Sequence, residues 1–487
     1  MYLLSLITFT PLIAAMIVLC LPKEKEKVIQ IVSLAAGAVS FAFSLLLLPA
    51  FDKHTPAMQF IERFPWIPSL DVNYIMGIDG LSLPLVILTT FMTLLALIGS
   101  LGIKERIKEY FFWFLVLETG MLGVFEALDL VLFYFFWELT LVPMYFLIGI
   151  WGGPKKEFAA IKFFLYTLSG SVFMLLAILA LYFNSTPNTF DMMALMNAHS
   201  LWSPRFQILV FLGFYLAFAI KVPAFPFHTW LPLAHVEAPT AVSVILAAVL
   251  LKMGVYGLLR ISYGMLPAGF EWFLPMLIVI AVVNIVYGAL CAMAQTDMKK
   301  MVAYSSVNHM GYCLLGVAGV SATGFSGAVL QMVNHGIITG SLFLLVGVIY
   351  DRAHTRDISA FGGLAARVPV YAALMSLACF ASLGLPGLAG FISEFLCFLG
   401  AFPRWKVYTA IGVLGILTTA AFFLRMIEKV FLGPMNNKWT GMSDMNAREL
   451  ASVVPLTVVT VALGFWPRWA LDFMNATMIH MAGLFNK

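Results

Sequence analysis

The chain has 487 residues, of which 62% are apolar and only 11% carry charged side chains. This balance excludes an ordinary soluble domain and is typical of a protein that crosses a membrane many times. The net charge of +4 says little about partners, because in membrane proteins the placement of Lys and Arg matters more than their sum. The five cysteines lie in apolar runs without a C-x-x-C pair, which argues against a metal site, an iron–sulfur cluster or a disulfide framework.

Apolar runs of membrane-spanning length recur along the chain and predict about fourteen spanning helices. The first run starts at the N-terminus, which lacks a basic segment and a small-residue cleavage site, so we expect a spanning helix and not a signal peptide. Residues 51–80 contain three prolines and a tryptophan and predict a structured interfacial loop. The tail after Arg468 is expected at the membrane interface. The predicted spans are 3–21, 28–50, 81–101, 110–126, 129–150, 160–184, 206–236, 240–261, 271–294, 301–319, 325–350, 368–402, 407–432 and 450–467.

Positive charge is distributed unevenly between the predicted loops. Loops that follow odd-numbered spans hold roughly twice as many Lys and Arg residues as the loops on the other side. Because cytoplasmic loops carry the excess of basic residues, we expect the odd-numbered loops in the cytoplasm and both termini on the outer side.

The stretch A-I-K-V-P-A-F-P-F-H-T-W-L-P-L interrupts the seventh span. Pro223 and Pro226 remove backbone donors and predict a broken helix near the middle of the membrane. Lys221 comes directly before this break, where a lysine costs roughly 3 kcal/mol on insertion scales and is therefore expected to have a partner and a function. His228 and His235 follow the break, and both proton entry and an ordinary loop role are open for them.

Two further ionisable residues are predicted at mid-depth in other spans. Lys252 lies about 18 Å along its helix from Thr240, and Glu138 lies about 14 Å from Asp129, at 1.5 Å per residue. Glu138 could only neutralise Lys221, or it could also tune how readily that lysine releases a proton.

The later spans add a carboxylate and two histidines. Glu394 follows a second break, which Pro386 and Gly387 predict, and it could serve either as a proton carrier or as a helix-terminus group. His309 and His335 could be packing residues, but an imidazole can accept a proton on one nitrogen while it donates from the other. Together with the central lysines, this pattern favours a proton relay inside the membrane.

The two predicted breaks fall at corresponding places in two sets of five spans. An odd number of spans per set means that the second set enters the membrane from the opposite side, which is typical of inverted-repeat transporters. We therefore predict an all-α polytopic membrane protein with two inverted five-helix repeats, each with a broken helix. The predicted parts are 1–109 (three helices and the interfacial loop), 110–261 (first repeat), 271–432 (second repeat) and 450–487 (last helix and tail).

Several motifs closely resemble the antiporter-like membrane subunits of respiratory complex I, the proton-pumping NADH:quinone oxidoreductase. They include F-W-E-L-T-L-V-P-M-Y, H-T-W-L-P-L-A-H-V-E-A-P-T-A-V, Q-T-D-M-K-K-M-V-A-Y-S-S-V-N-H-M-G and L-G-L-P-G-L-A-G-F-I-S-E-F, and the resemblance covers almost the whole chain. Leu233 departs from the pattern, because many members have an acidic residue there, and Asn308 replaces a frequent serine. The resemblance implies that the proton-channel residues are Glu138, Lys221, Lys252, His309, His335 and Glu394.

Two features favour the M branch of that family. Glu394 stands where the L and N branches carry lysine, and the chain ends soon after the last span without the long lateral helix of the L branch. The resemblance implies a proton-translocating subunit in a bacterial inner membrane, beside L- and N-like subunits and lipid, with no nucleic acid partner. NADH, FMN, iron–sulfur clusters and quinone would then bind to partner subunits, with no redox centre, metal or cofactor on this chain.

Other functions remain open from the sequence. The same fold and residues would serve an autonomous cation/proton antiporter, or the equivalent subunit of a related membrane hydrogenase or ferredoxin-driven complex. A quinone or haem enzyme, with His309 and His335 as haem ligands, has no other support in the sequence.

Overall fold

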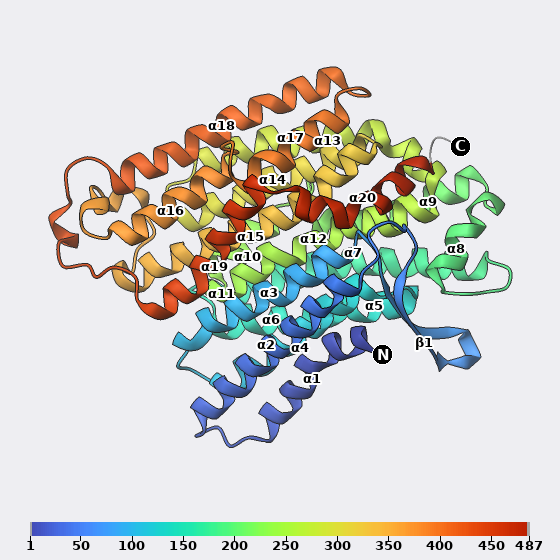
Figure 1. The fold of residues 1–487 in the computed structure, drawn as a ribbon, viewed down its shortest axis with the longest axis horizontal. Coiled ribbons are helices and arrows are strands. Elements are labelled where there is room, and N and C mark those ends of the chain that lie inside the picture. Colours follow the sequence, from blue (N-terminus) through green and yellow to red (C-terminus); the bar gives the residue numbers. More distant parts are fainter. Residues whose placement is uncertain (1, 485–487) are drawn as a thin grey trace.

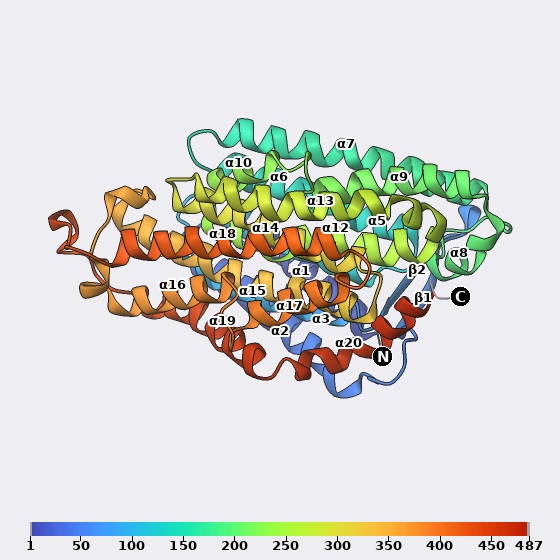
Figure 2. The ribbon, with the colours of Figure 1, turned by 90° about the horizontal axis from the view of Figure 1, so that it is seen from above.

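The computed structural model describes residues 2–484, which form a bundle of long helices lying side by side (Figures 1 and 2). In this part of the chain, 11 helical segments are long and apolar enough to cross a membrane, by length and composition. Two shorter apolar helices, α16 and α17, come from the predicted twelfth span. The helical membrane fold is therefore confirmed, whereas the number of spans and the inverted repeats remain predictions.

The boundaries of the helices follow the predicted apolar runs closely. The α-helices are α1 (Leu3–Cys20), α2 (Glu26–Ala50), α3 (Leu83–Gly99), α4 (Ile107–Glu126), α5 (Leu130–Leu139), α6 (Leu141–Trp151), α7 (Lys156–Phe183), α8 (Met192–Ala198), α9 (Pro204–Lys221), α10 (Trp230–Glu237), α11 (Thr240–Ile245), α12 (Leu251–Gly257), α13 (Pro267–Met293), α14 (Met298–Ala318), α15 (Ala322–Ala353), α16 (Pro369–Ser382), α17 (Ala389–Ala401), α18 (Lys406–Phe431), α19 (Ala447–Phe465) and α20 (Arg468–Gly483).

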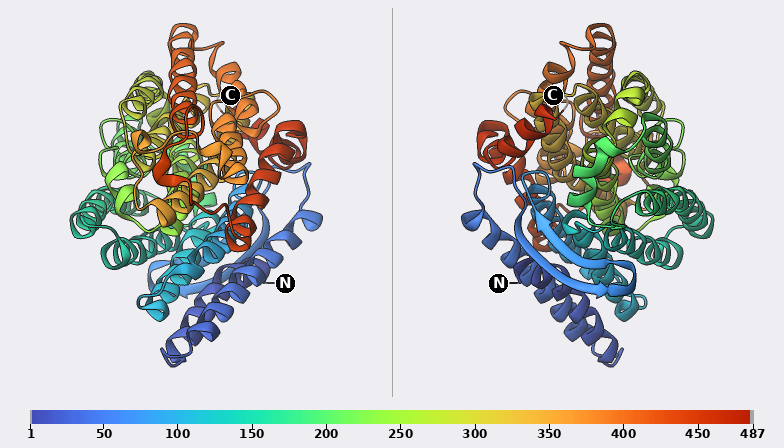
Figure 3. Two further views of the ribbon diagram at one scale, coloured as in Figure 1. Left: turned by 90° about the vertical axis from the view of Figure 1, so that its left-hand side faces the viewer. Right: turned by 90° about the vertical axis from the view of Figure 1, so that its right-hand side faces the viewer.

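The predicted interfacial loop contains a β-hairpin, which corrects the all-α prediction at this point. Strand β1 (Gln59–Ile67) pairs antiparallel with β2 (Val72–Ile78), and Phe64 lies opposite Tyr74. Aromatic and β-branched residues suit a pleated ribbon that covers the bundle with one face. The hairpin lies across one end of the bundle (Figure 3, right), and this end is called the hairpin end below.

The first predicted break is present. Helix α9 ends at Lys221, and a non-helical segment separates it from α10. Asn284 of α13 satisfies the backbone of this segment, because its side-chain oxygen accepts from the N–H of Phe225 at 2.7 Å and its Nδ2 donates to the carbonyl of Pro223 at 3.2 Å. A broken helix inside a membrane needs such partners, since lipid offers none.

The second predicted break is present as well. Helix α16 ends at Ser382 and α17 begins at Ala389. Gly384 and Gly387 have φ values of +81° and +93°, a region that residues with a Cβ rarely adopt, so glycine is required to turn the chain here. The side chain of Asn334, on α15, donates to the carbonyl of Ala389 at 2.7 Å.

Two spans that were predicted as continuous helices contain interruptions. The fifth span divides at Thr140 into α5 and α6, three residues before Pro143, whose missing N–H cannot bond to the preceding turn. The eighth span contains the π-helical turns η4 (Leu246–Leu250) and η5 (Leu258–Tyr263). Such turns have no strong sequence signal, because the same apolar residues also form a regular helix.

The predicted interfacial tail forms a helix. Helix α20 is joined to the rest of the hairpin end by two hydrogen bonds: the hydroxyl of Thr477 accepts from the N–H of Gly80 at 3.0 Å, and the hydroxyl of Tyr263 donates to the carbonyl of Met481 at 2.6 Å. The position of α20 relative to the membrane surface remains a prediction.

Candidate functional site

Lys252 and His335 are in direct contact inside the bundle. The Nζ atom of Lys252 lies 2.6 Å from Nδ1 of His335 on α15, and it also donates to the carbonyl of Ala247 in the π-helical turn η4. Both side chains are buried. The structure therefore joins two residues that lie 83 positions apart in the sequence.

A second contact joins His309 of α14 to Glu394 of α17. Nδ1 of His309 lies 3.2 Å from Oε1 of Glu394, and Nε2 lies 2.9 Å from the hydroxyl of Ser382, the last residue before the second break. The rings of His309 and His335 have centroids 5.5 Å apart. Lys252, His335, His309 and Glu394 thus form one continuous cluster.

A small cavity lies at the centre of this cluster. Its volume of about 10 Å³ corresponds to about one water molecule. Nε2 of His335 and the hydroxyl of Thr339, both from residues lining the cavity, have no protein hydrogen-bond partner. The other lining residues are His309, Gln331, Ile338, Ala381, Ser382, Gly390 and Glu394.

Neutral polar side chains hold the cluster in place. The hydroxyl of Ser393 donates to Oε1 of Gln331 at 2.5 Å and accepts from Asn334 at 3.0 Å. Gln331 in turn lies 3.5 Å from Nδ1 of His309. Sequence reasoning did not select Ser382, Ser393 or Asn334. Ser382 and Ser393 are small polar residues near the second helix break, whereas Asn334 lies in the middle of α15.

Lys221 lies in a separate cluster at the first break. Its Nζ donates to the hydroxyl of Thr140 at 3.3 Å and lies 5.0 Å from the centroid of the Trp137 ring, close enough for a cation–π contact. The side chain is buried, with 1% of its surface exposed. Thr140 and Trp137 come from the interruption between α5 and α6, which the sequence did not predict.

Glu138 does not form a direct ion pair with Lys221, because no nitrogen–oxygen contact within 4.0 Å joins them. Glu138 bonds to Ser171 of α7, and Ser171 accepts from the indole N–H of Trp137 at 3.2 Å. The charges of Glu138 and Lys221 are still close enough to interact electrostatically. Glu138 is only half-buried, so it lies at the side of the bundle and not on its central axis.

The two histidines after the first break lie in different surroundings. His228 is buried in the non-helical segment, with its ring stacked on Phe225 at 5.8 Å. His235 of α10 is fully buried against Phe343, with ring centroids 4.5 Å apart, and neither ring nitrogen has a hydrogen-bond partner. His235 is therefore an interior residue and not a surface loop residue.

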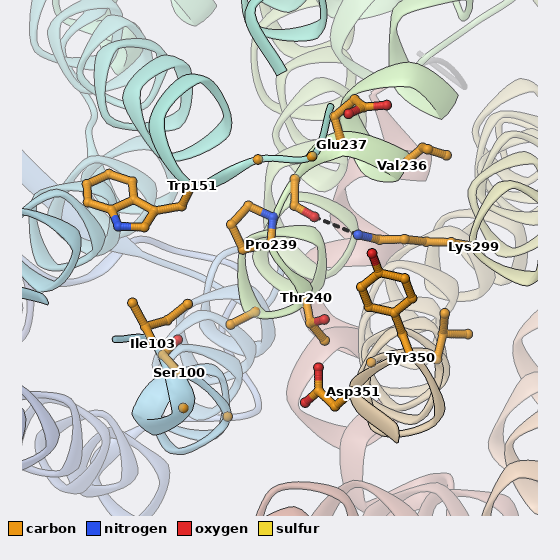
Figure 4. A pocket seen from close by; sticks show the side chains of 18 of the residues that line it. Ser100, Ile103, Trp151, Val236, Glu237, Pro239, Thr240, Lys299, Tyr350 and Asp351 are labelled. Carbon is orange, nitrogen blue, oxygen red and sulfur yellow. Dashed lines mark hydrogen bonds between the residues drawn. The ribbon is translucent and has the colours of Figure 1, made fainter. Parts of the chain in front are cut away.

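A charged pocket of about 360 Å³ is lined by Val236 and Glu237, which follow His235 in the chain (Figure 4). It lies at the end of the bundle opposite the hairpin end, where α3 ends and α11 begins. Glu237, Pro239 and Thr240 form part of its wall directly after α10. Lys299 reaches across and donates to the carbonyl of Ala238 at 2.5 Å. Asp351, Arg356 and Arg448 also line the pocket, so loops predicted to share one side of the membrane do meet at one end.

The described histidine, cysteine and carboxylate residues do not form a metal-binding group. In residues 2–484, no three or more His, Cys, Asp or Glu side chains gather in a way that could hold a metal ion. The predicted proton-channel residues divide instead into the Lys252 cluster and the Lys221 cluster.

The family of the chain follows from comparison with known proteins. A family model described as NADH:quinone oxidoreductase/Mrp antiporter, transmembrane, matches residues 127–422, more than half of the chain. The chain belongs to this family. Both clusters lie within the matched region.

Two bacterial relatives of this antiporter-family chain share a name. NADH-quinone oxidoreductase subunit M of Rhodobacter capsulatus is 45% identical over 495 residues, which cover 98% of this chain and 96% of the relative. A protein of the same name from Rickettsia conorii is 40% identical, covering 98% of this chain and 97% of the relative.

Solved structures share the antiporter-family fold. A chain in the structure titled respiratory complex I from Thermus thermophilus with bound NADH superposes with a TM-score of 0.91 at 30% identity, covering 99% of both chains. A chain of the Mrp complex from Dietzia sp. superposes with a TM-score of 0.87 at 20% identity, covering 99% of this chain and 98% of that chain, and this likeness concerns the fold alone.

Proposed function

We propose that the chain is a proton-translocating membrane subunit of an NADH:quinone oxidoreductase. Relatives named subunit M and the complex I chain support membership in that complex. The observation that carries the proposal is the continuous buried cluster from Lys252 through His335 and His309 to Glu394. NADH oxidation and quinone reduction would take place on partner subunits, with their FMN and iron–sulfur clusters, and this chain would move protons only.

The contacts suggest an order of transfer. The ammonium of Lys252 is placed to donate a proton to Nδ1 of His335 across 2.6 Å. The imidazole can release a proton from its other nitrogen, which borders the cavity of one water molecule. From there the proton would reach His309 and Glu394, and Lys252 would be left neutral and ready to accept another.

Lys221 would supply Lys252. Helices α9 and α12 pack closely at Gly254, where a Cβ would lie 2.7 Å from the carbonyl oxygen of Phe218, so the elements that carry the two lysines are neighbours. Since a nearby carboxylate stabilises the charged form of an amine, a change at Glu138 would alter how readily Lys221 releases its proton. The half-buried position of Glu138 would let a neighbouring subunit make that change.

Protons would enter from the pocket beside His235. This pocket is lined by loops that carry the excess of basic residues, and because such loops are typical of the cytoplasmic side, we infer that the pocket faces the cytoplasm. Both termini would then lie on the outer side. L- and N-like subunits are the neighbours we propose in the membrane arm.

An assembled complex with Lys221→Ala or Glu138→Ala tests the proposal. Both variants are expected to show sharply lower pumping-coupled NADH turnover, measured as proton uptake and electron transfer in inverted membrane vesicles. Lys429→Ala, at a side chain that is 57% exposed, is the matched control and should pump normally. Wild-type proton-to-electron ratios at wild-type rates in the first two variants would refute the proposal.

The second candidate is an autonomous cation/proton antiporter. The family description that matches the chain includes Mrp antiporters, and the same clusters would serve such exchange. The two candidates differ in whether the isolated chain is active.

A further inference from the structure

A buried ion pair lies at the hairpin end, outside the proposed proton pathway. Nη2 of Arg260, in the π-helical turn η5, lies 2.5 Å from Oδ1 of Asp79, which follows strand β2. The two side chains are only 5% and 3% exposed. Two charges removed from water to this extent are costly unless they are paired and hydrogen-bonded.

Both members of the ion pair form further hydrogen bonds with neighbouring groups. The carboxylate of Asp79 also accepts from the backbone N–H groups of Leu81 and Ser82, at 3.0 and 3.1 Å. The guanidinium of Arg260 donates to the hydroxyls of Ser82 and Tyr256, at 3.2 and 3.3 Å. Tyr256 donates to the carbonyl of Phe125 at 3.1 Å, so the network joins the start of α3, the end of α4 and η5.

One side of the pair borders a cavity. Asp79 and Arg260 line a space of about 340 Å³ at the hairpin end, together with Met193 of α8 and His480 of α20. This cavity and the pocket beside His235 therefore lie at opposite ends of the bundle.

The other side of the pair faces the centre of the membrane. Lys252 precedes Arg260 by eight residues, about 12 Å along a helix, and Tyr256 lies midway between them. All three side chains are buried. The guanidinium thus stands between the central lysine and the cavity.

We propose that the Asp79–Arg260 pair is a seal that prevents protons from passing between this cavity and Lys252. The inference rests on the proposed function. A guanidinium keeps its charge at all physiological pH values and cannot relay a proton, and its buried positive charge, which lines the cavity, repels hydronium ions. Protons on Lys252 are therefore directed to His335 and Glu394.

The test uses the assembled complex in liposomes with an imposed pH gradient and no NADH. R260Q removes the charge and is expected to make the gradient collapse several-fold faster than in the wild type. The double variant D79N/R260Q also removes the charge, without leaving a buried carboxylate unpaired, and is expected to leak in the same way. R260K keeps a positive charge, but its amine can release a proton where a guanidinium cannot, so it is expected to leak faster than the wild type. R63Q, which breaks an exposed ion pair with Asp191 at the same end of the bundle, is the control.

The route of the leak is tested by adding K252M to R260Q, which is expected to restore a tight membrane. A fast collapse of the pH gradient in the K252M/R260Q double variant would overturn the seal. So would a gradient that R260Q and D79N/R260Q hold as long as the wild type. If neither variant assembles, the pair is a structural tie and the seal is rejected. Pumping by the Lys221→Ala complex is measured separately and tests the proposed function. If R260Q membranes hold the gradient while the Lys221→Ala complex fails to pump, the seal is rejected and the proposed function stands.

Discussion

The ammonium of Lys252 has two acceptors of different chemistry. The carbonyl of Ala247 can only accept a hydrogen bond, whereas Nδ1 of His335 can accept the proton itself. Because this site is buried inside the bundle and away from water, a charged lysine is costly unless both acceptors are engaged. At the scale of the residue, the proposed mechanism therefore assigns to His335 the role of accepting the proton of Lys252.

We expect His335→Gln to separate these two roles. Glutamine can still accept a hydrogen bond from Lys252 but cannot take up its proton at neutral pH, so pumping-coupled turnover should fall several-fold while the complex still assembles. Proton uptake and NADH oxidation in membrane vesicles measure this. His354→Gln, at an exposed position, is the control. Normal pumping in the His335→Gln complex would place the relay elsewhere.

At the scale of the element, the broken helices depend on side chains from other helices. Asn284 of α13 serves the first break and Asn334 of α15 serves the second. Each amide replaces hydrogen bonds that an unbroken helix would make within itself. The breaks are consequently fixed structures and not loose segments.

Asn284→Ala should destabilise the first break. It would remove the acceptor of the Phe225 N–H and the donor to the Pro223 carbonyl, at a cost of about 1–3 kcal/mol for each buried group left unsatisfied. We expect a lower midpoint of thermal denaturation of the purified complex and weaker pumping. Asn184→Ala, at an exposed helix end, should leave both values unchanged. An unchanged midpoint in Asn284→Ala would mean that water replaces the amide.

At the scale of the whole molecule, many large apolar side chains remain on the outside of the bundle. Leu201, Val407 and Phe183 are 76%, 69% and 70% exposed. In a membrane protein such surfaces meet lipid or other subunits. The half-buried Glu138 lies on the side of the bundle as well, which suits a charge that responds to a neighbour.

Gentle extraction should distinguish a complex subunit from an autonomous antiporter. We expect the chain to copurify with L- and N-like subunits, and the isolated chain in liposomes to show no sodium- or potassium-dependent proton exchange. The measurements are the subunit composition of the purified sample and the decay of an imposed pH gradient on adding each cation. Cation-dependent exchange by the isolated chain would favour the antiporter.

The sequence by itself determined the membrane class, most helix boundaries, both breaks and the mid-depth lysines. These features rest on local signals, since apolar run length and proline position act on the segment in which they occur. Lys252, His335, His309 and Glu394 were selected because polar groups in apolar runs are conspicuous. The atoms through which these four side chains contact one another were not predicted.

Only the tertiary structure decided which of these groups touch. The contact of Lys221 with Thr140 and not with Glu138, and the ion pair of Asp79 and Arg260 across 181 positions, depend on how separate helices pack. The π-helical turns and the hairpin were likewise missed, because their residues fit more than one local conformation. The sequence shows which residues are unusual inside a membrane. The distances between these residues depend on how the helices pack, and a local sequence pattern does not specify that packing.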